Sequence, residues 1–126
     1  MSAFKTFRVE TNDGVAVVRF SQHTLLGHGL IGDLRSEFFA FIDAESPQKM
    51  LIDFTDVEFC STEVISLLLN IKRRLAKHNG RLKLCSMKDN VREVFRMLNI
   101  EKTVFDIHDT TNDALASFSA PESDSN

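Results

Sequence analysis

The stretch LIDFTDVEFCSTEVISLLL, residues 51–69, decides the fold. It opens with a short apolar run that suits a buried strand over residues 50–54. A polar turn follows, and then apolar side chains recur at helical spacing on so wide a stripe that the helix must be buried over much of its circumference. Ser61 stands where a helix N-cap is expected, and Gly80 where a helix typically ends. The stretch therefore predicts a strand, a turn and a buried helix, with the hydroxyl groups of Ser61 and Thr62 at the helix start.

The residues before this stretch predict a hairpin and a helix. Residues 7–10 and 15–20 are rich in strand-forming residues and flank an Asp-Gly pair, which favours a tight turn because glycine accepts a positive φ. The loop of residues 21–29 comes next. Apolar residues then recur every three or four positions, which predicts a helix over residues 30–44 that ends before a Ser-Pro pair.

The residues after it predict further alternation of strands and helices. We expect a strand at 81–86, a helix at 88–98, a short strand at 104–107 and a helix at 109–118. The whole order is strand-strand-helix-strand-helix-strand-helix-strand-helix, which predicts an α/β fold with a mixed five-stranded sheet and about four helices. Residues 1–118 form the predicted domain, and the small polar residues 119–126 are expected to be a disordered tail.

Composition narrows the functional classes. The chain has 126 residues, which suits one domain, and 15 basic against 18 acidic residues give a net charge of −3. Because nucleic-acid binding draws on a surplus of basic residues, we expect no nucleic-acid partner. The apolar runs are too short to span a bilayer, and residues 1–10 lack the apolar segment of a secretory signal. Together with two cysteines that look like reduced core thiols, this predicts a cytoplasmic protein without membrane insertion.

Two patterns offer an alternative, a small nucleotide-binding α/β domain. Residues 27–32 read G-x-G-x-x-G, and Asp53 lies about where an acidic residue would bind a ribose. In a dinucleotide site, however, a strand leads directly into the glycines, whereas residues 21–26 intervene here. We therefore prefer to interpret the glycines as a flexible loop that leads into a helix.

The metal-ligating residue types show no metal-site spacing. A structural zinc site needs four ligands, usually in C-x-x-C or H-x-x-x-H pairs, and neither pair occurs. We therefore expect no metal and no other cofactor. Cys60 precedes a helix start, where a thiol can become reactive, although a packed thiol is the preferred interpretation. The residues considered are His23, His28, His78, His108, Cys60 and Cys85.

The two hydroxyl groups at the helix start are the residues best suited to regulation. A phosphate there would gain the helix N-terminal N–H groups and the positive end of the dipole. It would also place about two negative charges on an otherwise apolar or neutral surface, which can abolish a protein contact. Ordinary N-capping by Ser61 without modification is the alternative.

This segment resembles the STAS domain of bacterial anti-sigma factor antagonists. The family pattern is an apolar strand ending in Asp, a short turn, and Phe-x-Asp-Ser-Ser-Gly-Leu at the start of an apolar helix. Here FCSTEVI, residues 59–65, falls on that motif, and NVREVFRML, residues 90–98, resembles a later helix of the family. The resemblance covers roughly residues 7–118 and implies the same order of strands and helices as derived above.

The resemblance also implies a function without enzymatic activity. The phospho-acceptor position falls on Thr62, with Ser61 as the alternative. The implied partner is an anti-sigma factor with Ser/Thr kinase activity, which the unmodified antagonist binds and from which phosphorylation releases it. A homodimer is a further open alternative. The expected partner-binding residues are His23, Thr24, Leu25, Leu26, Ser61, Thr62, Glu63 and Val64.

Two expectations about this surface can be checked in a structure. Leu25 and Leu26 are expected to be exposed in the loop, with Val64 at the centre of the contact, and the alternative is that both leucines pack under the helix predicted at 30–44. The family's Asp, second Ser and Gly are replaced here by Ser61, Glu63 and Val64. An unphosphorylated STAS scaffold and a subunit of a lipid-transport complex therefore stay open as alternatives.

Overall fold

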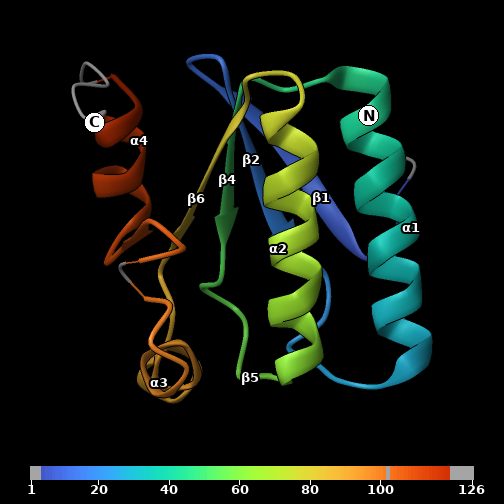
Figure 1. Ribbon diagram of the computed structural model, residues 1–126, viewed down its shortest axis with the longest axis vertical. Coiled ribbons are helices and arrows are strands. Elements are labelled where there is room, and N and C mark those ends of the chain that lie inside the picture. The colour runs from blue at the N-terminus through green and yellow to red at the C-terminus, as the bar shows by residue number, and fades with distance from the viewer. Residues whose placement is uncertain (1–3, 102, 120–126) are drawn as a thin grey trace.

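The computed structural model describes residues 4–101 and 103–119 (Figure 1). In this part of the chain a five-stranded sheet has the order β1-β2-β4-β6-β7, in which only β1 and β2 are antiparallel. Its strands are β1 (Phe7–Asn12), β2 (Val15–Phe20), β4 (Lys49–Asp53), β6 (Arg81–Cys85) and β7 (Ile107–His108). The helices are α1 (His28–Glu45), α2 (Thr62–Ala76), α3 (Asp89–Met97) and α4 (Thr111–Ser119). The mixed α/β fold predicted from the sequence is thus confirmed.

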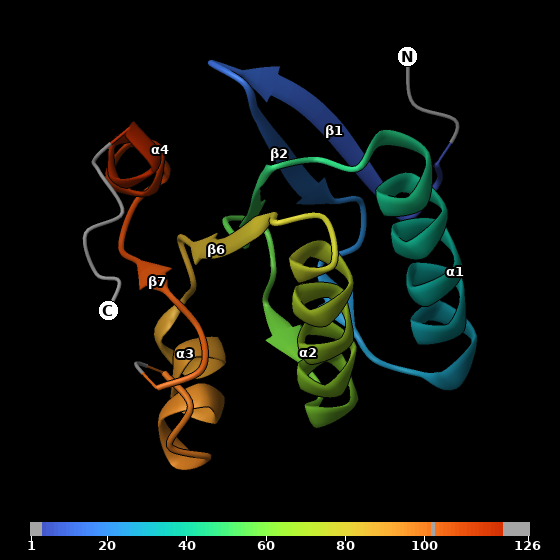
Figure 2. The same ribbon diagram turned by 45° about the horizontal axis from the view of Figure 1, so that its top comes forward.

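The helices cover both faces of the sheet. Side chains of α1, α2 and α3 share one hydrophobic cluster with the sheet, whereas α4 packs with a second cluster on the opposite face (Figure 2). The central strand β4 shows why two layers are needed, since Met50 and Ile52 point into the first cluster and Leu51 into the second, all fully buried. Such continuous burial is typical of parallel strands. None of the described helices is long and apolar enough to cross a membrane.

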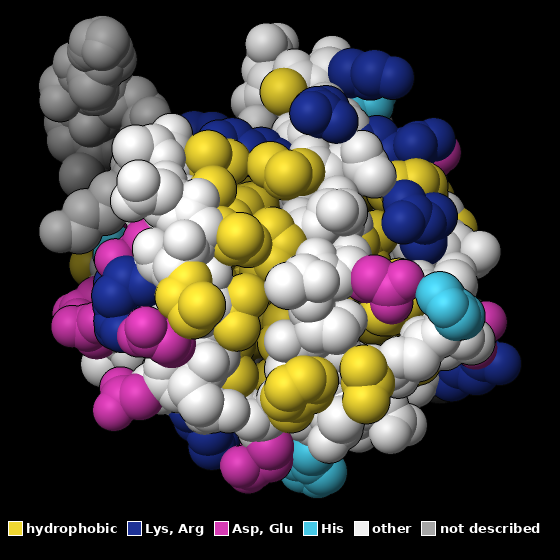
Figure 3. Space-filling view, turned by 60° about the horizontal axis from the view of Figure 1, so that its bottom comes forward, with side chains coloured by type: hydrophobic (Ala, Val, Ile, Leu, Met, Phe, Trp, Pro, Cys, Tyr) yellow, Lys and Arg dark blue, Asp and Glu magenta, His cyan; other side chains and the backbone are white. Residues whose placement is uncertain are grey.

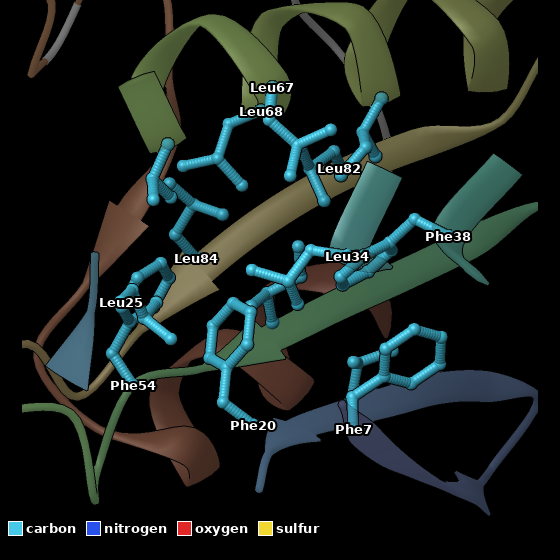
Figure 4. Close-up of a cluster of buried hydrophobic side chains, with 14 of the residues drawn as sticks. Phe7, Phe20, Leu25, Leu34, Phe38, Phe54, Leu67, Leu68, Leu82 and Leu84 are labelled. Carbon is cyan, nitrogen blue, oxygen red and sulfur yellow. The ribbon is translucent and has the colours of Figure 1, made fainter. Parts of the chain in front are cut away.

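Phenylalanine rings fill the first cluster. The rings of Phe7 and Phe38 lie 4.3 Å apart between centroids, and those of Phe20 and Phe54 lie 5.3 Å apart (Figure 4). Aromatic pairs at these distances stabilise a core beyond the area that they bury. The first pair joins the start of the hairpin to α1, and the second joins the end of β2 to the residue that follows β4.

Several element boundaries differ from the sequence-based predictions. The last strand is Ile107–His108 and not residues 104–107, because the N–H groups of Val104 and Phe105 turn back to the carbonyl of Ile100. The hairpin loop shrinks to Asp13-Gly14, both with positive φ, so that β1 runs on to Asn12. Two short strands, β3 (Thr24–Leu25) and β5 (Phe59–Cys60), were predicted as loops. Ser119 belongs to α4, and the rest of the predicted tail lies outside the described residues.

The helix predicted to run to about residues 79–80 ends earlier, at Ala76, and a turn over residues 77–79 follows it. Asn79, not Gly80, has the left-handed conformation, with a φ of 62°. The N–H of Gly80 bonds the carbonyl of Leu75 at 2.8 Å and that of Asn79 bonds Ala76 at 3.0 Å, which is the Schellman pattern. A Cβ on Gly80 would lie 2.6 Å from the carbonyl oxygen of Pro47. Glycine is therefore needed here for the close approach of two backbone segments.

Candidate functional site

A two-stranded parallel pair joins two loops at one end of the sheet. β3 follows β2, β5 precedes α2, and Leu25 pairs with Cys60 between them. The N–H of Ser61 donates to the carbonyl of Leu25 at 3.0 Å, and the N–H of Glu58 donates to the carbonyl of His23 at 2.7 Å. The structure therefore brings the loop of residues 23–26 and the start of α2 together, as the sequence analysis requires.

The two candidate hydroxyl groups differ in accessibility. Thr62 is the exposed first residue of α2. Ser61 occupies the N-cap position, but its side chain makes no capping hydrogen bond, which corrects the expected cap. Its Oγ is buried and has no hydrogen-bond partner within the described part of the chain. In this conformation only the hydroxyl of Thr62 is within reach of an incoming group.

Two of the residues expected in the partner surface are buried. Leu25 and Val64 are both 0% exposed and belong to the first hydrophobic cluster. The reason is geometric: β3 turns the Leu25 side chain inward, and Val64 lies on the face of α2 that packs against the sheet. The expectation that these two residues contact a partner directly is therefore wrong for this conformation, whereas Leu26 is 56% exposed as expected.

Sequence reasoning missed Phe59. Its ring is 45% exposed, although it is a large apolar residue. Because side chains alternate along a strand, burial of Cys60 turns Phe59 outward, and Phe59 pairs with Thr24 across the short ladder. The exposed residues at this end define what we call the docking surface: His23, Thr24, Leu26, Phe59, Thr62 and Glu63.

Polar contacts fix the margin of the docking surface. Glu63 lies in the first turn of α2, where a negative charge suits the helix dipole, and its Oε2 is 3.5 Å from Nδ1 of His28. The ring of His23 is held by a 2.9 Å contact from Nδ1 to the carbonyl oxygen of Asp56. Figure 3 shows this end of the molecule, where hydrophobic side chains gather between charged ones.

Asp53 has a structural role, and its carboxylate is not available to bind a ribose. Its buried carboxylate accepts hydrogen bonds from Nε of Arg19 at 3.0 Å, from the N–H and Oγ1 of Thr55 at 2.9 and 2.5 Å, and from Oγ1 of Thr111 at 3.3 Å. Both oxygens are therefore occupied by protein groups. The glycine motif does not form a loop either, since α1 begins at His28, directly after the first glycine.

The other candidate ligands are scattered. Within residues 4–101 and 103–119, no group of three or more His, Cys, Asp or Glu side chains is placed to hold a metal ion. Cys60 and Cys85 are free and buried, as predicted for core thiols. Burial raises the pKa of the Cys60 thiol to about 12, which is the opposite of the shift that a reactive thiol needs.

We expect Cys60 to resist thiol reagents while the protein is folded. In a Cys85→Ala variant, labelling of Cys60 by a disulfide reagent at pH 8 should be at least ~100-fold slower than in the unfolded chain, because the thiolate is scarce and covered. Absorbance of the released reagent measures the rate, and the same variant in denaturant is the control. Equally fast labelling in both states would show that Cys60 is reactive in the folded protein.

Comparison with known proteins agrees with this fold. The sequence model of the STAS domain family matches residues 6–114. The chain belongs to the STAS domain family. No curated protein matches it.

Solved structures of similar fold include anti-sigma factor antagonists. One is an anti-sigma-factor antagonist (STAS) domain protein from Planctomyces limnophilus, with 28% identity over 88% of this chain and 95% of that chain, and a TM-score of 0.76. Another is an anti-sigma factor antagonist from Mycobacterium paratuberculosis, with 27% identity, coverage of 91% and 94%, and a TM-score of 0.78. The phosphorylated form of SpoIIAA, a Bacillus cell fate determinant, shares the fold at 19% identity, coverage of 90% and 99%, and a TM-score of 0.63.

Proposed function

We propose that this chain is an anti-sigma factor antagonist that acts by binding and not by catalysis. Its partner is an anti-sigma factor with Ser/Thr kinase activity, bound in the cytoplasm through the docking surface. The observation that carries the proposal is the exposed hydroxyl of Thr62 at the start of α2, beside the β3–β5 pair with its exposed Leu26 and Phe59. The antagonists of similar structure support it.

Phosphorylation of Thr62 is the proposed switch. A partner that covers Leu26 and Phe59 would lie next to Thr62, because the β3–β5 pair and the hydrogen bond from Ser61 to Leu25 hold the start of α2 beside this loop. A phosphate would bring about two negative charges into that contact, where they lose their water. Glu63 already places a carboxylate next to Thr62, with its Oε2 3.5 Å from Nδ1 of His28. The phosphate would therefore repel Glu63 and disfavour the complex. The phosphorylated form of SpoIIAA supports such a modification in this fold.

The binding experiment uses the full chain and the kinase-type anti-sigma factor of the same organism. We expect Thr62→Asp to weaken the affinity measured by titration calorimetry by about tenfold, since a desolvated, unpaired charge costs at least ~1.4 kcal/mol.

Incubation with the kinase and ATP should add phosphate to the wild-type chain. Mass spectrometry should detect the phosphate and map it to residue 62, and Thr62→Val should abolish the modification.

Thr11→Asp is the matched control. Thr11 is an exposed threonine of β1 close to the hairpin turn, at the opposite end of the sheet from the docking surface (Figure 1). Its substitution adds the same charge and should leave the affinity unchanged. If Thr62→Asp binds as tightly as Thr11→Asp, the phosphorylation switch is wrong and an unphosphorylated scaffold takes its place.

A further inference from the structure

We propose that a groove between α1 and the second half of α2 binds an acidic segment of a protein, at a site separate from the docking surface. The groove is an open cavity of about 370 Å³. We call it the basic groove, and its lining residues are Phe39, Asn70, Arg73, Arg74 and Lys77. Three of these five side chains are cationic and none is acidic.

Positive charge is concentrated along α2 and the residues that follow it, and three of these cations line the groove, whereas Lys83 and Lys88 pair with Asp106 and Glu58 elsewhere. Residues 64–88 contain seven Lys or Arg and no Asp or Glu, in a chain with a net charge of −3. The helix dipole favours cations in the last turn of α2, but the basic residues extend beyond that turn. Figure 3 shows Lys and Arg side chains gathered at the upper right, over α1 and α2. The seven residues are Lys72, Arg73, Arg74, Lys77, Arg81, Lys83 and Lys88.

The groove is held in shape by one arginine. The guanidinium of Arg74 lies 4.2 Å from the centre of the Phe39 ring, and its Nε and Nη2 donate to the two carboxylate oxygens of Asp43 at 3.0 and 3.2 Å. Arg35 of α1 approaches the same ring at 5.9 Å. Because Arg74 is fixed by stacking and by a bidentate ion pair, a ligand does not have to order this side chain.

Two cations of the groove are left to meet a ligand. Arg73 donates only to the amide oxygen of Asn70, at 3.3 Å. Among the described residues, Arg73 and Lys77 form no direct ion pair, and the nearby Asp43 carboxylate, whose pKa Arg74 and, more weakly, Lys77 lower, is already bonded to Arg74. An Arg fork matches a carboxylate by two parallel hydrogen bonds, and a lysine four residues away lies on the same helix face. The geometry therefore suits two neighbouring Asp or Glu side chains of an acidic peptide segment.

The surroundings favour a protein segment over other polyanions. The net negative charge of the whole chain opposes nucleic acid, whose affinity depends on releasing many counterions. A membrane-binding surface would project apolar side chains outward, whereas Phe39 is half-buried under a guanidinium. A concave site with a few fixed cations instead suits a short acidic segment.

The basic groove and the docking surface lie at opposite ends of one helix. α2 has 15 residues, so its ends are about 20 Å apart. A ligand in the groove therefore does not cover Thr62. The inference stands without the proposed switch, because it rests on the charges and contacts of residues 35–43 and 70–77.

The test uses the full chain and a fluorescently labelled hexaglutamate peptide at low salt. We expect saturable binding by fluorescence anisotropy, NMR shifts confined to residues 35–43 and 70–77, and a loss of affinity of at least tenfold in the double variant Arg73→Glu/Lys77→Glu. The control Lys5→Glu/Arg8→Glu makes the same change of net charge at exposed sites outside the groove and should bind normally. Thermal melting checks that both variants fold.

Three results would overturn the inference. They are no binding of the peptide, an equal loss of affinity in both double variants, or binding of vesicles with anionic phosphatidylserine or of a DNA oligonucleotide in place of the peptide.

Thr62→Asp should bind the peptide like the wild type. A failure of the groove is thereby distinguished from a failure of the docking surface, because each variant set leaves the other site intact.

Discussion

Replacing Asp53 by alanine is expected to lower the free energy of unfolding by about 3–4 kcal/mol. The buried carboxylate joins three separate parts of the fold, namely Arg19 at the end of β2, Thr55 after β4 and Thr111 at the start of α4. Removing it leaves several donors without an acceptor in a place that water reaches poorly. Arg19 keeps its second ion pair, with Glu10, which limits the loss.

Chemical denaturation followed by circular dichroism measures this effect. Asp33→Ala is the matched control, because the Asp33 carboxylate is half exposed and its ion pair with Lys5 spans 3.9 Å. We expect this control to change stability by less than ~0.5 kcal/mol. Similar values for the two variants would show that the hydrogen bonds of Asp53 contribute little to the net stability.

Replacing Phe59 by alanine is expected to weaken binding of the proposed anti-sigma factor partner by about 30-fold, or about 2 kcal/mol. Exposed aromatic side chains that a partner covers commonly contribute this much, and Phe59 pairs with Thr24 within the docking surface. Phe59 is 45% exposed, so the substitution should lower the free energy of unfolding by about 1–2 kcal/mol and leave the chain folded.

Titration calorimetry with the same anti-sigma factor measures this loss, and thermal melting measures the stability. Met97→Ala is the control, since Met97 is an even more exposed apolar residue, at 75%, in the last turn of α3. An affinity that falls equally in both variants, or in neither, would contradict the role given to Phe59.

The main elements could be predicted because their signals are local. The Asp-Gly pair fixed the hairpin, and the apolar spacing from Val64 to Leu75 fixed the buried helix. The short strands β3 and β5 carry no such signal, because two residues show no periodicity and their pairing depends on contacts between distant segments. The last strand shifted for a similar reason, since Phe105 packs against Phe95 and not into the ladder.

The site could be predicted in outline only. The start of an apolar helix is visible in the sequence and offers two hydroxyl groups, those of Ser61 and Thr62; the family resemblance favours Thr62, and only the structure shows that Thr62 is exposed while the Ser61 hydroxyl is buried. The sequence does not show which apolar residues near Thr62 face outward. The register of the β3–β5 pair decides this, because it turns the Leu25 side chain inward and the Phe59 side chain outward. The basic groove was missed as well, since it needs Phe39 of α1 beside residues of α2.

The loop that carries His23 and Leu26 is held to the rest of the fold by main-chain atoms, by the buried Leu25 and by the contact of the His23 ring with Asp56. The carbonyl groups of His23 and Leu25 accept hydrogen bonds from the N–H groups of Glu58 and Ser61. Substitution of a side chain in the loop does not remove these main-chain acceptors. Outward-facing positions of this loop can therefore change their chemistry at little thermodynamic cost. If the gene for such a domain is duplicated, each copy can acquire its own binding partner by changing a few exposed side chains of this loop, while the fold stays the same.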